Sequence, residues 1–79
     1  MYYVYILQSQ VNSEKVYVGY TQNIDNRLKE HNAGECTHSS KYKPWRVMTY
    51  IAFDTKEKAT AFENYLKSGS GRSFAKRHL

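Results

Sequence analysis

The amino-acid sequence predicts an α+β domain with a small antiparallel sheet and the element order β-β-α-β-α-α. Three short stretches combine aromatic and β-branched residues, a composition typical of strands. Two other segments repeat apolar residues at helical spacing behind a capping residue, and a short basic helix can follow them. A chain of 79 residues has room for one domain, which we place over residues 1–79.

The three predicted strands follow from the apolar runs. The first covers Tyr2–Gln8 and the second Lys15–Tyr20, with the polar stretch Ser9–Glu14 between them. Because this stretch is rich in turn-forming residues, we expect the two strands to form a hairpin. The third strand covers Trp45–Phe53, after a polar and basic segment, Glu35–Pro44, that is expected to be a loop.

The first predicted helix covers residues 21–34. Thr21 or Asn23 can cap its start, and Gly34 can end it. Its apolar side is formed by Ile24, Leu28 and His31.

The second predicted helix covers Thr55–Gly69, with Thr55 or Asp54 as its cap and Gly69 as its end. Its apolar side is formed by Ala59, Phe62 and Leu66. The glycines of Ser68–Arg72 resemble a phosphate-binding loop, but the end of one helix followed by the cap of another is the simpler interpretation. Residues 70–79 then form a short basic helix.

The balance of charges favours a polyanionic partner. Lys and Arg number 12 against 7 Asp and Glu, so the net charge is +5, as in many nucleic-acid-binding domains. Cys36 is the only cysteine, which excludes an internal disulfide and fits a reducing compartment. No apolar run approaches the ~20 residues of a membrane span, and no secretory leader opens the chain, so we expect a cytoplasmic protein with no membrane partner.

Eight tyrosines raise the question of phenol chemistry or base stacking, although strand and core packing also explain aromatic residues. Tyr5 and Tyr17 project from the same face if the hairpin pairs residues whose numbers sum to 22 or 24, whereas a sum of 23 separates them. Gly19 lies on the face of Tyr17. It either leaves a gap for a backbone or ligand, or marks a bulge or a strand end.

Three further side chains are candidates for chemistry. Arg27 and His31 are helical neighbours; Arg27 is either a phosphate ligand or a solvated arginine, and His31 either a site residue or a last-turn histidine stabilised by the helix dipole. Glu63 lies at the margin of an apolar stripe, where it is either a metal ligand or the partner of Lys67 in an ordinary ion pair. The sequence contains no zinc-site spacing, Walker loop or Ser-His-Asp order.

Five segments, taken in order, resemble the GIY-YIG nuclease domain. They are YVYIL at 3–7, KVYVGYT at 15–21, NRLKEHNAGE at 26–35, KPW at 43–45 and AFENYLKSGSGR at 61–72. The closest likeness is to the small single-domain bacterial branch, which is itself similar to the catalytic domain of structure-specific endonucleases that cut branched DNA. The first name-giving tripeptide lacks its glycine, and the second has valine in place of isoleucine.

The resemblance implies a three-stranded antiparallel sheet flanked by helices and the hydrolysis of DNA phosphodiester bonds by water. It makes Tyr5 and Tyr17 the paired phenols, Arg27 the phosphate ligand, and Glu63 the carboxylate that binds one Mg²⁺ or Mn²⁺ ion. We expect Tyr17 to act as the general base, with His31 as a rival base or a proton relay.

The expected partner is DNA. Branched DNA, nicked DNA, single strands and RNA all stay open as the preferred substrate, and a targeting subunit is not identified. The alternative function is a nucleic-acid-binding module with little or no catalysis. In either case the expected phosphate contacts come from Lys15, Lys41, Lys43, Lys67, Arg72, Lys76 and Arg77.

Overall fold

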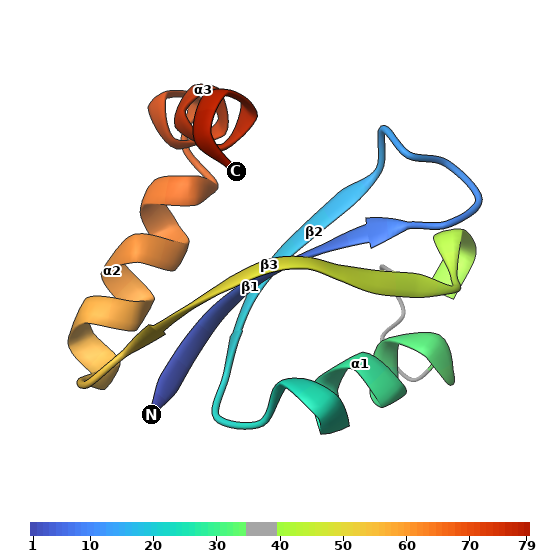
Figure 1. Cartoon of the computed structure of the whole chain (residues 1–79), viewed down its shortest axis with the longest axis horizontal. Coiled ribbons are helices and arrows are strands. Elements are labelled where there is room, and N and C mark those ends of the chain that lie inside the picture. Colours follow the sequence, from blue (N-terminus) through green and yellow to red (C-terminus); the bar gives the residue numbers. More distant parts are fainter. Residues whose placement is uncertain (35–39) are drawn as a thin grey trace.

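The computed structural model describes residues 1–34 and 40–79 of the chain. The elements in chain order are β1 (Tyr2–Ser9), β2 (Val16–Thr21), α1 (Ile24–Asn32), the 3₁₀ turn η1 (Ser40–Tyr42), β3 (Trp45–Phe53), α2 (Lys56–Leu66) and α3 (Gly69–His78). The predicted α+β class and the order β-β-α-β-α-α are therefore confirmed (Figure 1). The first half of the predicted loop, with Cys36, lies outside the described residues.

The three strands form one antiparallel sheet in the order β2-β1-β3, with β1 in the centre. The β1–β2 hairpin pairs Tyr5 with Gly19 and Leu7 with Tyr17, so the paired residue numbers sum to 24. Because residues two apart on a strand face the same way, Tyr5 and Tyr17 lie diagonally on one face of the sheet.

A bulge in β3 changes which of its residues face which side. Ile6 pairs with Thr49 but Leu7 pairs with Val47, so Met48 is the extra residue. Beyond the bulge, Val47 packs against the cluster that contains Leu7, whereas Met48 packs on the opposite face of the sheet. The extra residue thereby keeps an apolar side chain on each face of this edge strand.

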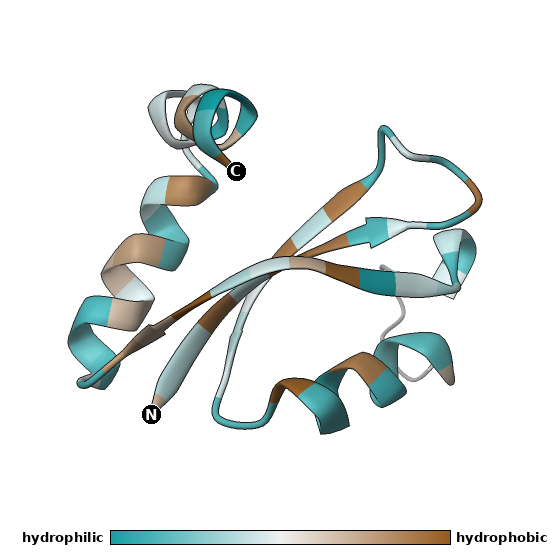
Figure 2. Ribbon diagram, viewed as in Figure 1, coloured by the Kyte–Doolittle hydropathy of each residue, from teal (hydrophilic) through white to brown (hydrophobic). Residues whose placement is uncertain are grey.

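The helices cover opposite faces of the sheet (Figure 1). On one face, Val4 and Ile6 of β1 pack with Ala59 and Leu66 of α2, and residues of α3 extend this cluster. On the other face, the buried hydrophobic residues are Tyr5, Leu7 and Trp45, and Tyr17 and Leu28 pack against them. Figure 2 shows the apolar residues of all three strands running through the layer between α1 and α2.

The first helix begins and ends with signals that the sequence contains. Asn23 caps α1, because its side-chain oxygen accepts a hydrogen bond from the backbone N–H of Asn26 at 3.0 Å. Gly34 adopts a left-handed conformation with φ 81° just beyond the helix, as expected of a glycine that follows a helix end.

The second helix ends earlier than predicted. α2 begins after its cap Thr55 but ends at Leu66, and Gly69 is the first residue of α3 rather than the end of α2. The prediction was wrong because Ser68 begins a new helix: its hydroxyl accepts from the backbone N–H of Gly71 at 3.1 Å. A β-carbon at Gly71 would overlap the carbonyl oxygen of Tyr65, so this glycine lets the two helices meet closely.

Candidate active site

Tyr5 occupies the space that Gly19 leaves open on the neighbouring strand. The two residues are paired across the hairpin, and a β-carbon built on Gly19 would overlap the Oη and Cζ atoms of Tyr5. Gly19 lies inside β2, so it marks neither a bulge nor a strand end. The gap expected beside this glycine is thus filled by the phenol of Tyr5 rather than by a ligand.

The hydroxyl of Tyr5 meets a histidine from α1. Tyr5 Oη and His31 Nε2 lie 3.3 Å apart, and the two side chains are 2% and 0% exposed. The ring of Tyr17 packs 4.6 Å from the ring of His31 and 6.3 Å from that of Tyr5, measured between centroids. We call Tyr5, Tyr17 and His31 the tyrosine–histidine cluster; only Tyr17 among them is partly exposed.

The environment of His31 favours its neutral form. Burial lowers the pKa of His31 below its ordinary value of 6.5, and the positive charge of Arg27 lowers it further, whereas Glu30 acts in the opposite direction. A histidine stabilised as a cation by the end of the helix would show the reverse shift. The structure therefore gives His31 the character of a buried neutral imidazole.

Arg27 lies one helical turn before His31 on α1. Its side chain is 40% exposed, and Nη1 is 3.4 Å from Oε1 of Glu30, which is 42% exposed. An ion pair this exposed and this long contributes little to stability. Arg27 can exchange Glu30 for a phosphate without breaking a buried contact.

Glu63 lies on α2, the helix that covers the other face of the sheet from the tyrosine–histidine cluster. Its carboxylate accepts from Lys67 Nζ at 3.0 Å, the ion pair considered as the alternative to a metal site. The Glu63 side chain is 19% exposed, and that of Lys67 is 52% exposed. Among residues 1–34 and 40–79, no three His, Cys, Asp or Glu side chains are grouped to bind a metal ion.

The expected phosphate contacts separate into two groups. The ammonium groups of Lys15 and Lys41 lie 5.4 and 5.5 Å from the ring centroid of Tyr42, and Lys43 Nζ lies close to Gly34 at the end of α1. Because Tyr42 packs against the buried hydrophobic cluster of Tyr5, Leu7 and Trp45, this first group lies on the same face of the sheet as the candidate site. The second group contains Lys67, which caps the end of α2, and Arg72, Lys76 and Arg77 of α3.

Two contributors to the site were not identified from the sequence. Tyr42 brings Lys15 and Lys41 together, although only the alternation of lysine and tyrosine in KYK pointed to it. The side chain of Asn32 bonds to both the backbone N–H and the carbonyl of Trp45, which fixes the end of α1 to the start of β3. No short motif signals such a contact between distant segments.

The chain belongs to the GIY-YIG family, because the family model of the GIY-YIG catalytic domain matches residues 1–77. The chain is 35% identical over 68 residues to a UPF0213 protein of Haloquadratum walsbyi, an alignment that covers 85% of this chain and 74% of the relative. It is 35% identical over 72 residues to a UPF0213 protein of Streptococcus pyogenes serotype M5, covering 90% and 76%.

A larger protein and a solved structure are also similar. The structure-specific endonuclease subunit SLX1 homolog of Giardia intestinalis is 34% identical over 65 residues, which is 77% of this chain and 18% of that protein. The solution NMR structure of a UPF0213 protein from Bacillus halodurans aligns with a TM-score of 0.56 and 33% identity, covering 96% of this chain and 81% of that one. Within the described part of the chain, no helix is both long and apolar enough to cross a lipid bilayer.

Proposed function

We propose that this protein is a metal-dependent endonuclease that hydrolyses phosphodiester bonds in DNA. The observation that carries the proposal is the tyrosine–histidine cluster, in which a buried tyrosine and a buried neutral histidine support a second, partly exposed tyrosine. Membership of the GIY-YIG family supports the reaction class, and the similarity to an endonuclease subunit supports DNA as the substrate.

In the proposed mechanism Tyr17 is the group that contacts the attacking water. A free tyrosine has a pKa of about 10, so a phenol needs help to act as a base at neutral pH. The ring of His31 packs against that of Tyr17 and its lowered pKa favours the neutral form, so the ring nitrogen of His31 that carries no proton can take the phenolic proton as Tyr17 accepts a proton of the attacking water. The P–O bond to the leaving oxygen then breaks, and that oxygen takes a proton from solvent. Tyr5 fixes the orientation of the imidazole through the contact at Nε2.

Arg27 is assigned to the phosphate. Negative charge builds on the phosphoryl oxygens as water attacks, and a guanidinium stays charged at every working pH and binds two oxygens at once. The position of Arg27 next to His31 on α1 supports this role, as does the weakness of its present contact with Glu30.

The metal requirement rests on Glu63. Mg²⁺ binds through one or two carboxylates and keeps several waters, so a single sheltered glutamate has suitable chemistry, provided that the exposed Lys67 moves away. An ion bound there would supply charge stabilisation at phosphoryl oxygens only if the DNA also reached α2, because Glu63 lies across the sheet from Tyr17 and Arg27. The paired state of Glu63, on the helix across the sheet, instead favours the alternative of a nucleic-acid-binding module with little catalysis.

The experiment is a panel of labelled branched, nicked, duplex and single-stranded DNA and single-stranded RNA, incubated with Mg²⁺, Mn²⁺ or EDTA. We expect cleavage that requires the divalent ion and is faster on DNA than on RNA. A protein carrying both Tyr17→Phe and Glu63→Gln, purified in parallel, reports contaminating nuclease. Binding without any cleavage above that control would reject the endonuclease and leave the binding module.

A further inference from the structure

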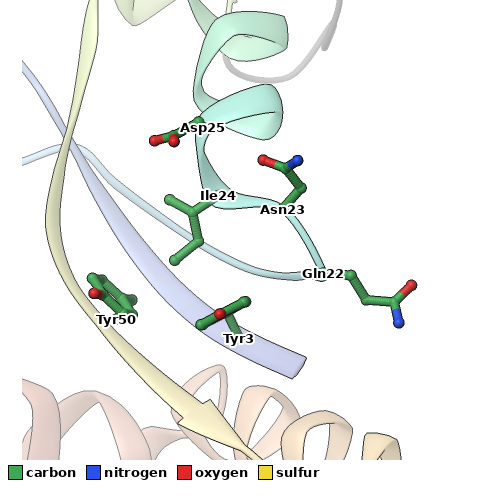
Figure 3. Close-up of a pocket in the computed structure, with 6 residues that line it drawn as sticks. All are labelled: Tyr3, Gln22, Asn23, Ile24, Asp25 and Tyr50. Atoms are coloured by element: carbon green, nitrogen blue, oxygen red, sulfur yellow. The ribbon is translucent and has the colours of Figure 1, made fainter. Parts of the chain in front are cut away.

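A second feature of the α1 face of the sheet is a hollow of about 340 Å³, where the start of β1 lies beside the end of β3. Figure 3 shows the six residues that line it: Tyr3, Gln22, Asn23, Ile24, Asp25 and Tyr50. Two strands supply the tyrosines, and the loop and first turn of α1 supply the rest. This volume is at the lower end of the range for small-molecule pockets, so it suits a group the size of one nucleobase with its sugar.

The hollow adjoins the tyrosine–histidine cluster through the register of the sheet. Tyr5 in the centre pairs with Gly19 on one side and with Tyr50 on the other. Because the Tyr5 ring leans over Gly19, Tyr50 does not share its space and packs instead against Tyr3. Paired α-carbons of antiparallel strands are about 4.5–5.5 Å apart, so the hollow begins one strand away from Tyr5.

The two tyrosines of the hollow offer an aromatic surface. Their rings meet edge to face with centroids 5.8 Å apart, so the edge of one ring covers one face of the other and the remaining faces lie outside this contact. Tyr50 is 55% exposed, although it is a large aromatic residue paired with the buried Tyr5 of β1. Proteins that bind single strands combine exposed aromatic side chains, on which bases stack, with a positively charged groove. Tyr50 therefore suits the stacking of an unpaired base next to the proposed phosphate contacts.

The charge of the lining selects a base rather than a phosphate. The six lining residues contain no cation, and Asp25 carries a negative charge in the first turn of α1, where it offsets the positive end of the helix. Figure 3 shows Asp25 at the rim of the hollow, with Ile24 between its carboxylate and the two tyrosines. A carboxylate there accepts from an exocyclic amino group, as on cytosine, and is repelled by the carbonyl oxygens of thymine.

We propose that this hollow binds one unpaired nucleobase of the substrate, stacked on Tyr50. A base with an exocyclic amino group binds more tightly, because that group can donate a hydrogen bond to Asp25. The inference rests on the proposed function only in that a nucleic-acid phosphate binds next to the hollow. It does not require that the protein cleaves the strand. It makes DNA or RNA with an unpaired nucleotide next to the site the preferred substrate class.

The test measures binding in EDTA, so that no cleavage is involved. Labelled single-stranded DNA and RNA 12-mers and a blunt duplex are titrated with the wild type, Tyr50→Ala, Tyr50→Phe and Tyr65→Ala. Tyr65 is the matched control, an exposed tyrosine on α2 across the sheet. Loss of one base stack should weaken single-strand binding about ten- to hundredfold in Tyr50→Ala alone and leave duplex binding within twofold.

The outcomes test base binding in the hollow independently of the proposed endonuclease activity. Equal single-strand affinity of Tyr50→Ala and the wild type, with all variants folded by circular dichroism, would overturn the pocket even if the protein cleaves DNA. The expected loss in a protein that cleaves nothing would support the pocket and reject the endonuclease. Oligo-dC should bind more tightly than oligo-dT, and Asp25→Asn should remove that difference; an unchanged preference would overturn the role of Asp25.

Discussion

The phenol of Tyr5 lies directly over Gly19 on the neighbouring strand, and this contact determines where the Tyr5 hydroxyl meets His31. Tyr5 is 2% exposed, so its ring is enclosed by protein and cannot move without displacing its neighbours. A β-carbon on Gly19 would overlap the ring at its hydroxyl end. The glycine therefore has a positional role, although it carries no chemical group.

Replacing Gly19 with alanine should disturb both stability and activity. The added methyl group forces the ring of Tyr5 away from its present position, and overpacking of this kind costs about 1–3 kcal/mol. Urea unfolding measures the loss, and cleavage should fall with it. The control is Gly69→Ala, where nothing lies within 4 Å and the change should stay within about 1 kcal/mol. Equal stability of the two variants would contradict the role of Gly19.

Removing the hydroxyl of Tyr17 should affect activity alone. Tyr17→Phe keeps the ring packing and should reduce the single-turnover cleavage rate by about 10²–10⁴, the range for loss of a general base. Tyr5→Phe also loses the contact with His31, so its free energy of unfolding should fall by about 0.5–1.5 kcal/mol as well. Tyr20→Phe, on the opposite face of β2, should match the wild type. Wild-type cleavage by Tyr17→Phe would remove it as the base.

The buried His31 should make stability depend on pH. Burial and Arg27 lower its pKa in the folded protein below 6.5, so the unfolded chain takes up the proton first as the pH falls. The stability from neutral His31 is complete above pH 6.5 and is lost as the pH falls below 6.5 through the lowered pKa. Unfolding measured at several pH values should show this loss in the wild type, and His31→Gln should reduce it. His78→Gln, which changes an exposed histidine, should leave it intact.

Glu63 should be essential for cleavage but not for folding. Glu63→Gln removes the carboxylate charge and an i,i+4 ion pair worth about 0.3–0.5 kcal/mol, so thermal unfolding should change little. Cleavage in Mg²⁺ should be abolished, whereas Glu57→Gln, on an exposed position of the same helix, should cleave normally. If Glu63→Gln cuts DNA at the wild-type rate in Mg²⁺, the metal assignment is wrong.

Much of the fold could be predicted because local patterns determine it. The third strand has the predicted bounds Trp45–Phe53, and the caps Asn23 and Thr55 were among the predicted candidates. The early end of α2 was missed because Ser68 and Gly69 are compatible both with ending a helix and with starting one. The Ser68 cap and the close packing of Gly71 against the backbone of α2 favour the start of a new helix.

The site was less predictable because it depends on contacts between distant segments. The sequence allowed Tyr5 and Tyr17 to share a face in two of three registers, and the turn of the hairpin selects the one in which Tyr5 opposes Gly19. Helical spacing placed Glu63 at a sheltered margin, which its 19% exposure confirms. That spacing contains no information on which face of the sheet the helix covers, so the separation of Glu63 from the tyrosine–histidine cluster could not be foreseen.

The last prediction separates phosphate binding from chemistry. Arg27 lies beside the tyrosine–histidine cluster, whereas Lys15 and Lys41 lie around Tyr42 at its margin. Arg27→Ala should therefore remove most single-turnover cleavage and leave the affinity for DNA almost unchanged. Lys15→Ala combined with Lys41→Ala should do the opposite, because exposed lysines contribute mainly by releasing counterions from the phosphates.

The salt dependence of binding distinguishes these roles. Each phosphate contact contributes about 0.9 to the slope of log affinity against log salt for duplex DNA, so the double lysine variant should lower the slope by about 2 units, and Arg27→Ala by less than 1. Lys76→Ala with Arg77→Ala is the matched pair on α3, across the sheet, and shows whether that helix also touches DNA. If Arg27→Ala loses binding and cleavage in equal proportion, Arg27 is an anchoring contact and the binding-module interpretation gains support. If instead cleavage falls at least tenfold more than affinity, its interaction with the phosphate is made mainly in the transition state.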